Sequence, residues 1–133
     1  YHTGQQLPLP NTLLHQIAIQ FVVMMRDEEI LALHRVMMAC ASQHPDICQS
    51  FFEQGCLRLN QQLQGYFELA NQAKLLCIPN VQRAADQFLA LFLGRQHLQG
   101  LLMLGTPTEA EDRAMIEDNL NLFLKGYPCD LID

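Results

Sequence analysis

The sequence has no tryptophan and few charged residues, and its basic residues form no cluster. Charged residues make up 17% of the 133 residues, and the net charge is −6. The eight Lys and Arg residues are scattered along the chain, whereas a nucleic-acid surface needs clustered cations to neutralise phosphates. We therefore expect no nucleic-acid-binding surface on this chain alone.

Patterns typical of metal-binding and catalytic sites are also missing. The five histidines are dispersed, and no two of them lie four residues apart, as paired ligands on one helix would. Cys48 and Cys56 fall in an apolar stripe, where cysteine usually behaves as a small hydrophobic residue. There is no glycine-rich phosphate loop. We expect no metal site, no cofactor and no enzymatic activity.

The cysteines and the apolar runs bear on the location of the protein. Five cysteines, an odd number without a CxxC pair, argue against a disulfide framework and for reduced thiols in a cytoplasmic protein. The longest apolar stretch, residues 88–104, has Arg95 and His97 near its centre and is shorter than the roughly 20 residues that a membrane span needs. We expect no membrane association.

The apolar residues that are present recur with helical spacing. Hydrophobic residues make up 50% of the chain, and positions i, i+3 and i+4 mark one buried face of a helix. We predict an all-α fold, a bundle of five main helices in one domain over residues 10–127. The expected helices cover residues 10–25, 28–43, 45–72, 81–104 and 107–126. Residues 1–9 would be a linker or the remnant of a connecting helix, and residues 128–133 a tail.

Capping residues support several of these boundaries. Asp27 and Asn80 are expected to cap the second and fourth helices, and Gly105 to end the fourth. Thr106 would cap the last helix, with Glu109 as the acid of a capping box.

Two of the expected helices differ from the others in composition. Helix 28–43 is apolar on most sides, so we expect it to be central. Helix 45–72 is long, and Gly55 is the point at which a break is expected.

Helix 81–104 is apolar on two faces, and the second face needs a partner because monomers rarely expose large apolar patches. We predict that it pairs with helix 107–126 and with their symmetry mates in a four-helix interface across a two-fold axis. The predicted interface residues are Phe88, Leu91, Arg95, Leu98, Leu102, Ile116, Leu120 and Phe123. His97 is expected to face this interface, and Gly94 and Gly100 to allow close approach of a neighbouring helix. The alternative is that both faces are interior to one subunit.

Three stretches resemble one family of regulators. "LALHRVMMACASQHPDICQSFFEQG" resembles the middle of the effector-binding domain of TetR/AcrR-type transcriptional regulators, through His34-Arg35, residues 44–47, Phe51 or Phe52, and Gly55. "NVQRAADQFLALFLG" resembles the start of the first dimerisation helix in that family, and "LGTPTEAED" the turn into the second.

This resemblance implies the regulatory domain of a bacterial one-component transcriptional regulator. Such a domain forms a homodimer and senses a small apolar or amphipathic molecule. Operator DNA would be bound only through an N-terminal helix-turn-helix domain that this chain does not contain. The alternative is a helical protein–protein interaction module without a small-molecule site.

Methionines are concentrated in the first two predicted helices, and their flexible side chains suit adaptable pockets. Supported by the resemblance, we predict a cavity between the first four helices, with His34 and Gln96 as its polar groups. The predicted lining residues are Phe21, Met24, Met25, His34, Met37, Met38, Phe52, Cys56, Leu59, Phe92 and Gln96. The alternative is that the methionines are ordinary core residues.

Overall fold

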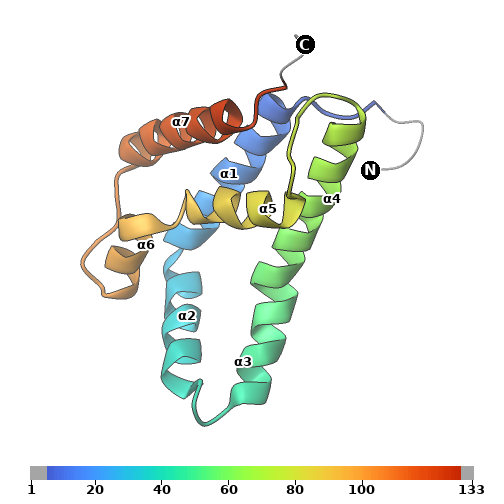
Figure 1. Ribbon diagram of the computed structural model, residues 1–133. Helices are drawn as coiled ribbons and strands as arrows, with labels where there is room; N and C mark the ends of the chain where they lie inside the picture. The colour runs from blue at the N-terminus through green and yellow to red at the C-terminus, as the bar shows by residue number, and fades with distance from the viewer. Residues whose placement is uncertain (1–5, 130–133) are drawn as a thin grey trace.

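The computed structural model describes residues 6–129, and in this range the chain is helical without a strand. The predicted all-α class is confirmed (Figure 1). The helices are α1 (Pro10–Arg26), α2 (Glu28–Cys40), α3 (Pro45–Phe52), the π-helical turn η1 (Glu53–Leu57), α4 (Arg58–Gln72), α5 (Val81–Ala90), α6 (Gly94–Leu101) and α7 (Glu109–Gly126).

The helix starts follow from side chains that accept hydrogen bonds from free backbone N–H groups. The Asp27 carboxylate accepts from the Ile30 N–H, and the Asn80 side chain accepts from the Arg83 N–H. The last helix begins two residues later than expected, with Thr108 as its N-cap and Glu111 completing the capping box.

The two longest predicted helices are both interrupted. The expected break at Gly55 is a π-helical turn between α3 and α4, which leaves the helical path continuous. Predicted helix 81–104 is instead two helices. α5 ends at Ala90, a turn over residues 91–93 follows, and α6 starts at Gly94, which adopts a positive φ of 48°. Gly100 is buried in α6, where an added Cβ would lie 3.2 Å from a methyl carbon of Leu31 on α2. Only the second glycine therefore serves close approach.

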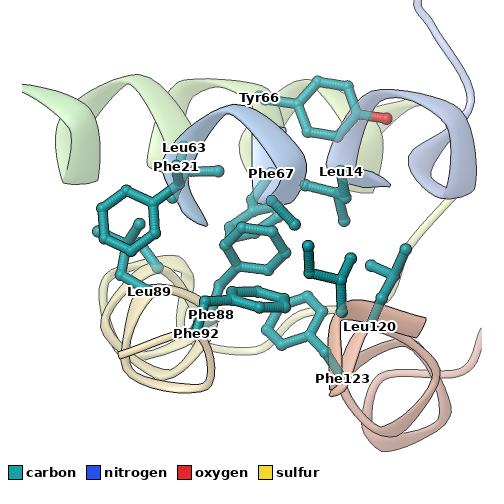
Figure 2. Packing of buried hydrophobic residues seen from close by; sticks show 14 of the residues in the cluster. Leu14, Phe21, Leu63, Tyr66, Phe67, Phe88, Leu89, Phe92, Leu120 and Phe123 are labelled. Carbon is teal, nitrogen blue, oxygen red and sulfur yellow. The ribbon is translucent and has the colours of Figure 1, made fainter. Parts of the chain in front are cut away.

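The core is formed by α1, α4, α5 and α7 (Figure 2). Its centre is aromatic: the rings of Phe67 and Phe123 stack with centroids 5.6 Å apart, and Phe88 meets Phe123 edge-on at 5.2 Å. Such contacts add roughly 0.5–1.5 kcal/mol each beyond the burial of apolar area.

Helix α2 is not central, which corrects the prediction made from its composition. Leu31 is its buried residue, while Val36 and Met38 are 56% and 64% exposed. Figure 1 shows α2 and α3 as a hairpin whose tip extends beyond the other helices. The apolar sides of α2 therefore face solvent in this subunit.

Two arginines connect helices that are distant in sequence. Arg26 at the end of α1 donates through Nε and Nη2 to both carboxylate oxygens of Asp112 on α7, each at 2.9 Å. Arg35 on α2 donates to the carbonyl oxygens of Gly100 and Leu101, the last turn of α6, at 2.7 and 2.8 Å. A cation at a helix C-terminus also favours the helix dipole.

The cysteines differ from the expectation of reduced thiols. Cys77, in the loop between α4 and α5, forms a disulfide with Cys129, which follows α7. The two are 52 residues apart in sequence, and the pairing leaves no signature in their spacing. Cys40, Cys48 and Cys56 are free, as predicted.

Candidate functional site

An apolar groove runs between α1 and α4 and has a volume of about 700 Å³. This size lies in the range of about 300–1,000 Å³ that is typical of small-molecule sites. Its lining residues are Leu13, Ile17, Gln20, Phe21 and Met24 from α1, and Leu59, Gln62, Leu63, Gly65, Tyr66 and Leu69 from α4. We call it the α1–α4 groove.

Helix periodicity explains how α4 lines the groove. Gln62, Gly65, Tyr66 and Leu69 recur at spacings of three and four, so they form one row on the helix. Gly65 leaves this row open, because an added Cβ would meet nothing within 4 Å. The Tyr66 hydroxyl donates to the Pro8 carbonyl oxygen at 2.7 Å, which fixes the segment before α1 beside the groove.

The groove collects three of the predicted ligand residues: Phe21, Met24 and Leu59. Met25 and Phe92 are instead part of the hydrophobic core. Met38, Phe52 and Cys56 are exposed on the α2–α3 hairpin and on η1, and none of these five lines the groove. The predicted residues therefore do not form one cavity, because they are divided between the groove, the core, and the α2–α3 hairpin with η1.

Sequence reasoning missed most of the α4 side of the groove. Gln62 is exposed, and it lines the groove together with Gly65 and Tyr66. The available signal was Gly65 itself, since glycine in a helix interior costs about 1 kcal/mol against alanine.

The two polar groups predicted for the ligand site lie elsewhere. The ring of His34 contacts Phe51 of α3 and His97 of α6, with centroid distances of 5.6 and 5.8 Å. Gln96 lines a small hollow of about 230 Å³ beside the loop between α6 and α7. Met37, half-buried on α2, offers its carbonyl oxygen to the Cys48 thiol. His97 thus faces α2 rather than a dimer surface, which corrects the expectation for this residue.

The contact between His34 and His97 favours neutral imidazoles. Desolvation lowers the pKa of His34. Burial, and then the nearby charges of His34 and Arg26, lower the pKa of His97. The Nδ1 atom of His97 is buried and has no hydrogen-bond partner among the described residues. Protonating either ring would place a charge in a poorly solvated contact.

The predicted dimer surface is only partly exposed. Phe88, Ile116, Leu120 and Phe123 are buried in the core of the subunit, so these four predictions are corrected. The remaining candidates lie on the outside: Leu91 is half-buried, Arg95 is exposed, and Leu98 and Leu102 are 55% and 59% exposed. Leu122 of α7, which was not predicted, is 60% exposed and shares a surface depression with Leu91.

Within residues 6–129, no group of three or more His, Cys, Asp or Glu side chains could hold a metal ion. No helix in this range is long and apolar enough to span a membrane.

Comparison with known proteins gives one match. Neither the curated proteins nor the solved structures contain a significant match to the chain. The sequence pattern of the family described as "AefR-like transcriptional repressor, C-terminal domain" matches residues 12–129. This range includes every helix of the fold except the first two residues of α1. The chain belongs to this family of TetR-type C-terminal regulatory domains.

Proposed function

We propose that this chain is the ligand-sensing and dimerisation domain of a one-component transcriptional regulator, and that its effector binds in the α1–α4 groove. The observation that carries the proposal is an apolar groove of about 700 Å³ in a chain of this regulator family. The effector would be a small apolar or amphipathic molecule.

The chemistry of the groove supports this class of effector. Leucine, isoleucine, phenylalanine and methionine side chains supply most of its surface, and burying apolar ligand area against them is favourable by roughly 25 cal/mol per Å². Gln20 of α1 and Gln62 of α4 both line the groove, and their amides can orient a polar end of the ligand. No charged side chain lines it.

The packing of the two groove helices suggests how binding would be transmitted. α1 packs on α7, and α4 packs on α5. α1 also contacts α6. A ligand that changes the separation of α1 and α4 would therefore bias α6 and α7, where the dimer candidates Arg95, Leu98 and Leu122 lie. Such coupling is a free energy shared by two sites, so dimer geometry and ligand affinity would influence each other.

The proposed partners follow from the same assignment. The functional unit would be a homodimer in the bacterial cytoplasm, a location that rests on the family and not on the cysteines. Operator DNA would be contacted only through a separate N-terminal domain of the full regulator. The dimer surface would use Leu91, Arg95, Leu98 and Leu102, together with Leu122.

Filling the groove tests the proposal. In Gly65→Leu, the new side chain occupies open space, and replacing a helical glycine does not weaken the helix. We expect this variant to bind the uncharged probe N-phenyl-1-naphthylamine at least about tenfold more weakly than the native chain, as measured by fluorescence titration, which corresponds to about 1.4 kcal/mol.

The control is Gln61→Leu, which adds the same side chain to α4 at an exposed position outside the groove. It should bind the probe as the native chain does. Equal probe affinity in all three proteins would contradict the groove as the effector site. Absence of probe binding in the native chain would favour the alternative, a protein–protein interaction module without a small-molecule site.

A further inference from the structure

Two free thiols meet at the tip of the α2–α3 hairpin. Cys40 is the last residue of α2, and Cys48 lies in the first turn of α3. Their sulfur atoms are 4.0 Å apart. Both thiols are half-buried, and both donate to the same acceptor, the Met37 carbonyl oxygen, at 3.7 Å from Cys40 and 3.4 Å from Cys48.

The backbone of the hairpin holds the two cysteines in this arrangement. The His44 N–H donates to the Cys40 carbonyl oxygen at 2.8 Å, and the Cys48 N–H donates to the His44 carbonyl oxygen at 3.2 Å. These two hydrogen bonds link the backbone of Cys40 to that of Cys48 through a single residue. The turn itself therefore places the two sulfur atoms next to each other.

We propose that Cys40 and Cys48 are a redox-active thiol pair, which a peroxide converts into a disulfide that closes the α2–α3 hairpin. In the first step one sulfur attacks a peroxide oxygen, giving a sulfenic acid and one water. In the second step the other thiol attacks the sulfenic sulfur, forming the S–S bond and releasing a second water. Two thiols and one hydrogen peroxide thus give one disulfide and two waters, with the sulfurs oxidised and the peroxide oxygens reduced.

The distance between the sulfurs suits the second step. A sulfenic acid on either residue has the other thiol within van der Waals reach, and a resolving thiol at this position is the usual companion of a redox-responsive cysteine. Desolvation, followed by the hydrogen bond and charge of Cys40 and the charge of Asp46, raises the pKa of the Cys48 thiol. A raised pKa favours the thiol form of Cys48 at neutral pH.

The bond would join the hairpin close to the histidine contact described above. His34 lies on α2 before Cys40, and its partner Phe51 lies on α3 directly after the turn that contains Cys48. Oxidation would fix α2 against α3 at the turn that joins them. The proposal does not depend on an effector or on the α1–α4 groove.

Peptide mapping of the whole chain tests the proposal. Trypsin and Asp-N together place Cys40 on residues 36–45, and Cys48 with Cys56 on residues 46–58. After treatment with hydrogen peroxide and alkylation of the remaining thiols, we expect these two peptides to be joined by a disulfide that dithiothreitol reverses. We also expect Cys40 and Cys48 to lose reactivity toward the alkylating reagent in parallel, because one disulfide consumes both thiols.

Two variants assign the bond. Cys56→Ser should retain the joined peptides, and Cys48→Ser should lose them while Cys40 stays accessible to the alkylating reagent. Joined peptides in Cys48→Ser would show that Cys56 is the true partner and would overturn the proposal. Complete alkylation of Cys40 and Cys48 in the peroxide-treated native chain would overturn it as well.

Discussion

The side chain of Asp112 connects α7 to the end of α1. Its carboxylate accepts two hydrogen bonds from Arg26, and the two side chains are only 13% and 11% exposed. Replacing one partner of a buried ion pair leaves the other charge without compensation, which typically costs about 3–5 kcal/mol.

We predict that Asp112→Ala lowers the free energy of unfolding by about 3 kcal/mol, measured by urea denaturation. Asp118→Ala, an exposed position on the same helix, is the control and should change it by less than about 0.5 kcal/mol. Equal effects of the two substitutions would show that the ion pair does not hold α1 against α7.

His34 and His97 make the stability depend on pH. Because their pKa values are lowered in the folded chain, the unfolded chain binds more protons below about pH 6.5, and stability rises with pH in that region. We predict that the free energy of unfolding falls as the pH is lowered from 7 to 5. The loss begins near the unfolded pKa and continues toward the lower folded pKa values.

The variant His97→Gln should reduce this dependence, because it removes one of the two titrating rings. His44→Gln removes an exposed histidine outside the contact and serves as the control. Urea titrations at several pH values measure the slope for each protein. A slope in His97→Gln as steep as in the native chain would exclude His97 as a source of the pH dependence.

At the scale of helices, local chemistry made some boundaries predictable and others not. Asp27 and Asn80 were predicted as N-caps because their side chains accept hydrogen bonds only a few residues away. The start of α7 was misplaced because the pattern Thr-x-x-Glu occurs twice, from Thr106 and from Thr108. Local sequence alone does not decide which of the two overlapping capping boxes forms.

Features that depend on contacts between distant parts of the sequence were not predicted. Gly94 was read as an interior glycine, whereas it starts α6 with a positive φ. The burial of α2 was overestimated because composition shows that a helix is apolar but not what covers it. The disulfide was missed because Cys77 and Cys129 are brought together only by the fold.

The disulfide ties the segment after α7 to the loop between α4 and α5. That loop is also held by Asn71, whose amide exchanges two hydrogen bonds of 2.8 Å with the backbone of Ile78. A cross-link spanning 52 residues restricts the unfolded chain, and its removal typically costs about 2–4 kcal/mol.

We predict that Cys77→Ser lowers the unfolding midpoint in urea. Dithiothreitol should lower the midpoint of the native chain to the same urea concentration. Dithiothreitol should not change Cys77→Ser further. Cys56→Ser, which removes a free thiol, should behave as the native chain does. An unchanged midpoint of the native chain on reduction would contradict a stabilising role for this bond.

At the scale of the whole molecule, the site was predicted less well than the fold. Phe21, Met24 and Leu59 come together along the α1–α4 groove, and their role in ligand binding stays a prediction. The other predicted pocket residues are separated because some lie on the α2–α3 hairpin, whereas others, such as Met25 and Phe92, are buried in the core. The predicted dimer surface contained core residues, since Phe88 and Phe123 have the same spacing whether they face a partner or the interior.

Exposed leucines nevertheless remain on α6 and α7. Leu98, Leu102 and Leu122 are each more than half exposed, and large side chains of this kind gain about 1.5–3 kcal/mol each when fully buried. A second copy of the chain is the partner that we propose for them.

Native mass spectrometry of the chain, with N-phenyl-1-naphthylamine added, tests the central claim most directly. We predict a complex of twice the chain mass of 15.2 kDa that carries the bound probe. Leu98→Glu should give the single-chain mass, while Val36→Glu, an equally exposed site on α2, should remain a dimer. A native chain that stays at the single-chain mass, or a dimer that binds no probe, would contradict the account.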